Sequence, residues 1–182
     1  MNLKDDNIDE IVRGNELSFE LFMKNHANSL YHYAIGFTKQ KESAEEIVSD
    51  VFYEVWKSRK ILPSIKNVQA WLCTITYHKS ISYIRKENGY KEISFDEIDN
   101  FFWEAVQSPD EEIIAKERME LINKAIQVLP PKCKHVFFLA KIENLPYKEI
   151  AEMLHISVKT INNHISFALD KIRNYLKDCE DK

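Results

Sequence analysis

The feature that most constrains the fold of this chain is the spacing of its apolar residues, which recur every three to four positions along most of its 182 residues. This spacing predicts amphipathic helices, and no segment shows the apolar–polar alternation of a half-buried strand. Ser43 is expected to cap one helix, and Pro63 breaks the pattern, so residues 58–67 are expected to form a loop. The predicted fold class is all-α, in two small helical domains. Helices are predicted over 17–38, 44–57, about 67–87, 110–128, about 131–143, and two further segments that end near Leu176.

Charged residues are unevenly distributed, although 25 Lys and Arg against 29 Asp and Glu leave a formal net charge of only −4. Residues 17–91 carry eleven bases and seven acids, and residues 113–182 carry twelve bases and nine acids. Residues 92–112 carry eight acids and no base. Because local charge decides nucleic-acid contact, we interpret the chain as two mildly basic domains, 1–91 and 113–182, joined by an acidic linker over 92–112. Three aromatic residues of this linker could dock on another part of the chain: Phe101, Phe102 and Trp103.

Composition argues against several functional classes. The three cysteines form no C-x-x-C pair, so neither a disulfide framework nor a cysteine zinc site is indicated, and a reducing, cytoplasmic setting is expected. The longest apolar run, Val136–Ala140, is too short to span a bilayer, and the polar, acidic N-terminus is not a signal peptide. With only three glycines, a glycine-rich phosphate loop is excluded. The six histidines show no metal-ligand spacing, so we expect no metal, cofactor, catalytic residue or small-molecule substrate.

The stretch 149–165, "EIAEMLHISVKTINNHI", predicts two short helices joined by a three-residue turn, the layout of a helix-turn-helix. Pro146 suits the first turn of the first helix, and Ser157 suits the N-cap of the second. His155 occupies a turn position often filled by glycine, where the backbone φ is positive and His is one of the tolerated residues. The expected inner face of the first helix consists of Ile150, Ala151 and Leu154.

The second helix of this hairpin is predicted to read DNA. Its apolar stripe is expected to consist of Val158, Ile161, Ile165, Ala168, Leu169 and Ile172. On a helical wheel, the residues that point away from this stripe are Lys159, Thr160, Asn163, His164, Ser166 and Phe167. Asn can pair with adenine, Lys with guanine or phosphate, and Thr with a thymine methyl group. The alternative is an ordinary helical hairpin with a solvated polar face.

A second basic segment lies between Lys57 and Lys91, where eight bases accompany one acid. Three aromatic residues are interleaved with these bases: Trp71, Tyr77 and Tyr83. Positive charge follows a nucleic-acid backbone and aromatic faces stack unpaired bases, so this pattern is compatible with single-stranded DNA. The alternative is a solvated basic face with a core tryptophan. The mixed polar stripe of the helix is expected to consist of Trp71, Thr74, His78, Ser82 and Arg85.

The preceding helix has the opposite character. Carboxylates at Glu46, Asp50 and Glu54 cluster with Tyr53 and Trp56, and DNA would repel that face. Such a surface is a better site for protein binding.

Three segments together resemble a known family. They are "SAEEIVSDVFYEVW", "NVQAWLCTITYHKSISYIRK" and "LPPKCKHVFFLAKIENLPYKEIAEMLHISVKTINNHISFALDKIRNYL". They resemble the sigma-70 family, in its short extracytoplasmic-function (ECF) subfamily, over about 17–91 and 110–177. This sequence departs from the family pattern at Glu46 and Ser49, where Asp and Gln are usual. It also departs at His78 and Ser82, where Asn and an acidic residue are common.

The resemblance implies an initiation factor that binds core RNA polymerase and promoter DNA, with domain 1–91 as sigma region 2 and domain 113–182 as sigma region 4. It also implies an anti-sigma factor, which in many members is membrane-linked, and a linker that threads the path of nascent RNA. The implied polymerase contacts are Glu46, Ser49, Asp50, Tyr53 and Trp56. The implied −35-type contacts are Ser157, Lys159, Thr160, Asn163, His164, Ser166 and Phe167. The implied −10-type contacts are Arg59, Lys60, Lys66, Asn67, Trp71, Thr74, His78, Ser82, Arg85 and Lys86.

Two alternatives remain open at this point. A stand-alone helix-turn-helix regulator, repressor or activator, would explain the C-terminal half but not the basic, aromatic segment of the first domain. An enzyme is disfavoured, because Cys133 and His135 are two residues apart and would point to different faces of a helix.

Overall fold

The computed structural model describes residues 7–89, 101 and 113–180, and every regular element among these residues is helical. The prediction of an all-α fold in two small helical domains is therefore confirmed. The chain divides into two compact units, residues 1–91 and residues 92–182, which are described separately below. No helix in the described part of the chain is both long and apolar enough to cross a membrane.

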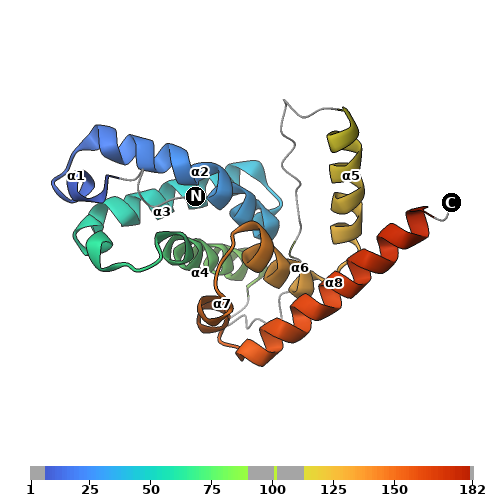
Figure 1. The fold of residues 1–182 in the computed structure, drawn as a ribbon. Coiled ribbons are helices and arrows are strands. Elements are labelled where there is room, and N and C mark those ends of the chain that lie inside the picture. The colour runs from blue at the N-terminus through green and yellow to red at the C-terminus, as the bar shows by residue number, and fades with distance from the viewer. Residues whose placement is uncertain (1–6, 90–100, 102–112, 181–182) are drawn as a thin grey trace. The chain divides into compact units, whose positions relative to one another are not determined.

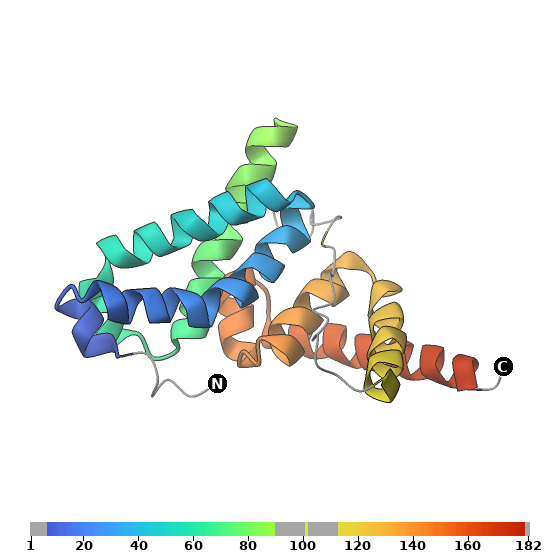
Figure 2. The ribbon, with the colours of Figure 1, turned by 90° about the horizontal axis from the view of Figure 1, so that it is seen from above.

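Unit 1 is built from three long helices that pack against one another. Figures 1 and 2 show α2 and α3 side by side, with α4 crossing them, and α1 packs on η1 and α2. The apolar faces of the long helices form the core, in which Phe22, Leu30, Val51, Val55 and Leu72 are fully buried. The elements are α1 (Ile8–Val12), α2 (Glu16–Thr38), α3 (Lys41–Lys57), the 3-10 helix η1 (Arg59–Ser64) and α4 (Val68–Asn88).

Two local predictions in unit 1 are wrong. Helix α3 begins at Lys41 after Gln40, so Ser43 lies inside its first turn and is not the N-cap. The Ser43 hydroxyl instead donates to Gln40 Oε1 (3.3 Å) and bonds the Tyr83 hydroxyl of α4 (2.9 Å). The segment expected to be a loop contains η1, because burial of Leu62 holds the chain against the unit and a short 3-10 turn accommodates Pro63.

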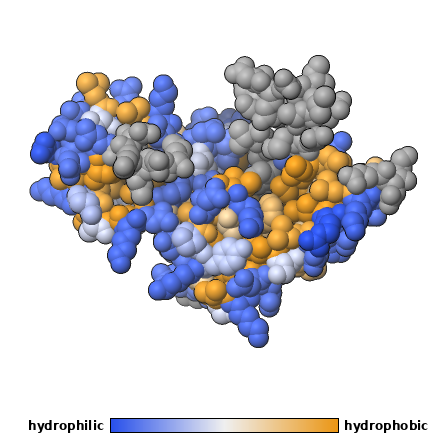
Figure 3. All heavy atoms as spheres, in the orientation of Figure 1, coloured by the Kyte–Doolittle hydropathy of each residue, from blue (hydrophilic) through white to orange (hydrophobic). Residues whose placement is uncertain are grey.

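Unit 2 is arranged around one long helix, α8, which packs on α5, α6 and α7. The predicted helix over about 131–143 is present, but its last turn is a π-helix, in which the Glu143 N–H donates to the Phe138 carbonyl (3.1 Å). Figure 3 shows a broad apolar area alongside α8 in this unit. The elements are α5 (Ile113–Gln127), α6 (Pro131–Phe137), the π-helix η3 (Phe138–Ile142), α7 (Tyr147–Leu154) and α8 (Val158–Glu180).

The acidic linker predicted over 92–112 lies outside the described residues, apart from Phe101. The ring of Phe101 is only 2% exposed and docks on unit 2. It stacks on His135 of α6, with ring centroids 4.7 Å apart, and lies 5.9 Å from the ring of Phe138. The expectation that an aromatic residue of the linker docks is thus met by Phe101, whereas Phe102 and Trp103 are not described.

Candidate nucleic-acid interface

The hairpin of unit 2 has the predicted helix-turn-helix geometry. Helix α7 ends at Leu154, three residues follow, and α8 begins at Val158. His155 has φ 55° and ψ 40°, in the left-handed region, and the Ile156 N–H donates back to the Ala151 carbonyl (3.0 Å). The helix therefore ends with a residue in the left-handed backbone conformation, a position that glycine usually occupies. The predicted inner face of α7 is buried, since Ile150, Ala151 and Leu154 are each less than 8% exposed.

The start of α8 is fixed by a side-chain cap. Ser157 Oγ accepts the Thr160 N–H (3.0 Å), and the two hydroxyl oxygens lie 2.8 Å apart. The predicted N-cap is therefore present. The Ser157 and Thr160 hydroxyls are both used in this cap, which leaves them less hydrogen-bonding capacity for DNA than the sequence suggests.

The predicted orientation of His164 is wrong. Its ring is half-buried, and Nδ1 lies 3.1 Å from the Sγ of Cys133 on α6. The helical wheel failed here because the helices packed on α8 cover the side that carries His164 and leave Val158 and Leu169 exposed, so the buried face is rotated relative to the predicted apolar stripe. Burial raises the pKa of the Cys133 thiol, which keeps the sulfur protonated and uncharged at neutral pH.

The exposed face of the first half of α8 is formed by polar residues with one aromatic. Phe167 is 42% exposed, and the Lys171 ammonium lies 5.6 Å from its ring centroid, within cation–π range. Val158 and Leu169, expected in the apolar stripe, are 43% and 41% exposed. The other predicted contacts that are exposed are Ser157, Lys159, Asn163 and Ser166.

Asn162 is a candidate contact that the sequence reasoning missed. Its side chain is exposed, and its Nδ2 donates to the Val158 carbonyl (2.9 Å), which orients the amide. Asn162 stands three residues after Lys159 and four before Ser166, so the i, i+3, i+7 spacing of the exposed polar residues could have revealed it.

In unit 1, the predicted −10-type residues fall into two groups, one with exposed and one with half-buried side chains. Asn67 caps α4 by accepting the Ala70 N–H (3.1 Å), while the Thr74 and Ser82 hydroxyls donate to carbonyls of their own helix (both 2.8 Å). The residues with exposed side chains are Lys60, Lys66, His78, Ser82 and Lys86. Those with half-buried side chains are Arg59, Asn67, Trp71, Thr74 and Arg85.

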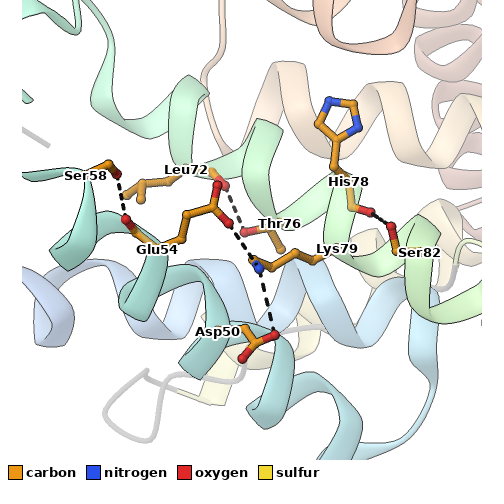
Figure 4. Close-up of polar contacts among 8 residues, drawn as sticks. All are labelled: Asp50, Glu54, Ser58, Leu72, Thr76, His78, Lys79 and Ser82. Atoms are coloured by element: carbon orange, nitrogen blue, oxygen red, sulfur yellow. Dashed lines mark hydrogen bonds and ion pairs between the residues drawn. The ribbon is translucent and has the colours of Figure 1, made fainter. Parts of the chain in front are cut away.

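Two cations of the basic segment are turned towards α3. The Lys79 ammonium lies 3.1 Å from Glu54 Oε2 and 3.8 Å from Asp50 Oδ2, as Figure 4 shows, while His78 points away from this cluster. The Arg59 guanidinium lies 4.5 Å from the ring centroid of Trp56 and donates to the Trp56 carbonyl (2.9 Å). Their positive charge is thus directed to the protein, which concentrates the solvent-facing charge on the exposed lysines.

Of the three interleaved aromatic residues, two serve the fold. Tyr77 is buried, and this burial raises the pKa of its hydroxyl, although the nearby Arg85 acts in the opposite direction. Tyr83 bonds Ser43 of α3. Half-buried Trp71 is the remaining candidate for stacking on an unpaired base.

The outer face of α3 is acidic and exposed, as predicted. Glu46, Ser49, Asp50 and Tyr53 are all exposed, with Tyr53 at 68%. Trp56 is half-buried, because its ring packs on Phe19 of α2 (centroids 4.8 Å apart). An exposed tyrosine on a helix face that carries carboxylates is suited to a protein partner.

Comparison with known proteins agrees with this geometry. The family description "Sigma-70 region 2" matches residues 22–89, and "Sigma-70, region 4" matches residues 119–172. The ECF RNA polymerase sigma factor SigM of Bacillus subtilis is 28% identical over 132 residues, which cover 72% of this chain and 78% of that protein. The ferric citrate uptake sigma factor FecI of Escherichia coli is 23% identical, over 85% of this chain and 88% of that protein.

The fold is also found in solved structures. The sigma factor RpoE of Bartonella quintana, in complex with the anti-sigma factor NepR, has a TM-score of 0.59 at 21% identity, covering 87% of this chain and 96% of that one. CnrH in complex with the cytosolic domain of CnrY has a TM-score of 0.58 at 19% identity, covering 94% of this chain and 95% of that one.

A helix-turn-helix unit together with a second, basic helical unit defines a nucleic-acid-binding protein of the transcription machinery. The two sigma-70 regions together match more than half of the length of the chain. The chain therefore belongs to the sigma-70 family, as an RNA polymerase sigma factor of the ECF subfamily. The predictions of family and function are confirmed. The alternative of a stand-alone regulator has no support among these relatives.

Proposed function

We propose that the outer face of α3 docks on core RNA polymerase, that α4 and the segment before it open a −10-type element, and that the first half of α8 reads a −35-type element. In this proposal, residues 1–91 form sigma region 2, residues 92–112 the acidic linker and residues 113–182 sigma region 4. The linker, with eight acids and no base, would occupy the path that polyanionic RNA later takes.

The observation that carries this proposal is the separation of charge within unit 1. Lys79 and Arg59 satisfy groups on α3, so the exposed positive charge among the predicted −10-type contacts comes from Lys60, Lys66 and Lys86. The exposed face of α3 carries carboxylates and Tyr53. A basic surface with Trp71 suits a DNA strand, whereas an acidic surface suits a basic protein surface. One unit can therefore bind polymerase and promoter at the same time.

For the −35-type element, we propose direct contacts from Lys159, Asn162, Asn163 and Ser166, with Phe167 beside them. Amide side chains can pair with adenine in the major groove, and a lysine can reach guanine or a phosphate. His164 is instead assigned to packing against Cys133.

Regulation by an anti-sigma factor is also proposed. Two solved structures that share the fold contain such a partner or the cytosolic domain of a second protein. We infer that this sigma factor acts in the cytoplasm and is held by an anti-sigma factor. We propose no catalytic activity, cofactor or small-molecule substrate for the chain.

The test is reconstitution with core RNA polymerase. We expect a stable complex that transcribes from a specific promoter, which core enzyme alone does not use. Replacing Tyr53 and Asp50 by alanine should weaken core binding, whereas replacing Asn162 and Asn163 should weaken use of the upstream element and leave core binding intact. Equal loss of core binding in both variants would contradict the assignment of the two surfaces.

A further inference from the structure

We propose that the short helix α1 and the turn after it position η1, and through η1 the residues that read the −10-type element. The proposal rests on the assignment of η1 and α4 to that element. Ile11 and Gly14 are the positioning residues, and neither has to contact DNA. Both precede residues 22–89, which sigma-70 region 2 matches.

Helix α1 is held in place by its packing on the rest of unit 1. It has five residues, too few for a helix to be stable in water by itself. Ile11 is 0% exposed, and α1 packs on η1 and on α2. Burial of the Ile11 side chain is therefore the largest apolar contribution that keeps α1 against η1.

The turn between α1 and α2 is closely defined. The Gly14 N–H donates to the Ile11 carbonyl (2.9 Å). The Asn15 N–H donates to the Glu10 carbonyl (2.9 Å), and the Asn15 side chain caps α2. Gly14 has φ 89°, a left-handed value that favours glycine. The turn thus fixes the direction in which α1 joins α2.

The same turn lies against η1. A Cβ placed on Gly14 would be 3.9 Å from Nη2 of Arg59, which is ordinary van der Waals contact. The Arg59 guanidinium also stacks on and bonds the last turn of α3, and Leu62 of η1 is 1% exposed. The inner side of η1 is therefore held by its neighbours, while Lys60 and Ile61 are exposed.

The position of η1 depends on these neighbours because its own bonding is weak. It is a six-residue 3-10 helix with Pro63 inside, and 3-10 hydrogen bonds have poorer geometry than α-helical ones. Contacts to a base weaken steeply when the atoms shift by about 1 Å, so residues that read DNA have to be held by packed surroundings. We infer that α1 supplies part of that support.

Promoter preference of the full chain bound to core polymerase tests the proposal. Ile11→Ala removes the apolar contact, Ile11→Val keeps most of it, and Gly14→Ala disfavours the turn without removing a buried side chain. The control is Leu30→Ala, in the second half of α2, because Leu30 is also 0% exposed. Transcription is measured on promoters that differ at single positions of the −10-type or the −35-type element.

Ile11→Ala should lower the preference for the best −10-type element over a substituted one by about tenfold and leave the −35-type preference unchanged. Gly14→Ala should act in the same direction with a smaller effect, and Ile11→Val should remain close to wild type. Leu30→Ala should reduce the amount of folded protein. It should therefore lower transcription from all promoters by the same factor and leave both preferences unchanged.

Hydrogen exchange in the free protein gives an independent readout of η1. The Ile61 and Ile65 N–H groups donate to the Ser58 and Leu62 carbonyls (both 3.0 Å). Exchange of these two amides should accelerate by roughly tenfold or more in Ile11→Ala. Leu30→Ala should leave their exchange unchanged, because a surface turn exchanges by local opening.

Unchanged exchange of these amides in Ile11→Ala would show that α1 does not hold η1, and would overturn the proposal. Accelerated exchange with an unchanged −10-type preference would overturn the role of α1 in reading DNA, as would an equal loss of preference in Leu30→Ala. A wild-type protein that forms no complex with core polymerase, or has no −10-type preference, would overturn the proposed function instead. The exchange data would still report whether α1 holds η1.

Discussion

The Sγ of Cys133 lies 3.1 Å from Nδ1 of His164, and this contact joins α6 to the helix that is proposed to read DNA. The sequence placed His164 outward as a DNA contact, whereas the structure gives its ring a partner inside the protein. The orientation of the reading helix therefore depends in part on a neutral thiol.

We predict that Cys133→Ala and His164→Ala each lower the free energy of unfolding by about 1–2 kcal/mol, because each removes a part-buried hydrogen-bonding partner. Chemical denaturation measures this loss. The double variant should cost less than the sum of the single variants, with a coupling of about 0.5–1.5 kcal/mol. Cys133→Ser, which keeps a hydrogen-bonding group, is the control. Strict additivity would show that the two residues act independently.

Asn162 should determine part of the promoter preference. Asn162→Ala is expected to cost about 1–3 kcal/mol in discrimination at one base position, if the amide contacts a base edge. Competition transcription over a library of upstream elements measures this effect, and Asn174, on the same helix far from its start, provides a matched Asn→Ala control. A uniform loss over all sequences would assign Asn162 to the DNA backbone.

The exposed lysines and Lys79 should differ in their effect on the salt dependence of DNA binding. If Lys66 or Lys86 contacts a phosphate of the open strand, its replacement by alanine should reduce the slope of log affinity against log salt by about 0.7. Lys79→Ala should leave the slope unchanged, because its ammonium pairs with Glu54 and Asp50. Binding of the holoenzyme to a pre-melted template at several salt concentrations measures the slopes.

His135 should make unit 2 less stable at acid pH. Burial lowers its pKa from 6.5 to about 3, so the unfolded chain binds a proton more readily than the folded one. The resulting stability is present above pH 6.5 and is lost at up to about 1.4 kcal/mol per pH unit as the pH falls towards 3. Denaturation at a series of pH values measures this dependence. His135→Leu should flatten it, and an identical dependence in that variant would assign the effect to other groups.

His155 should tolerate glycine better than a β-branched residue. Its backbone is left-handed, so His155→Gly should be neutral or stabilise the fold by up to about 1 kcal/mol, whereas His155→Val should cost about 1–2 kcal/mol. Thermal unfolding distinguishes the two variants. Equal effects would mean that the side chain of His155, and not its backbone conformation, matters at the turn.

The sequence predicts most of the fold because amphipathic spacing is a local property. The buried face of α3, for example, includes every apolar residue that its spacing places on one side: Ile47, Val48, Val51, Phe52 and Val55. The three-residue turn and the Ser157 cap were predictable for the same reason, since capping acts over only a few residues.

The errors concern side chains whose partners are distant in sequence. The cation of Lys79 is paired by carboxylates 25 and 29 residues earlier, and His164 meets Cys133 across 31 residues. A helical wheel treats a helix as having one neighbour, whereas α8 has three. Individual site residues could therefore be assigned only from the packing of the helices. The helices that carry the site could be predicted without it.

The π-turn of η3 has a consequence for insertions and deletions in this part of the chain. Its Glu143-to-Phe138 hydrogen bond spans one more residue than an α-helical bond would. Deleting one residue here would allow α6 to continue as a regular α-helix. The chain would then leave this helix, on its way to α7, in a direction rotated by about 100° about the helix axis. The one extra residue of this turn thereby sets the rotational phase of the hairpin that follows it.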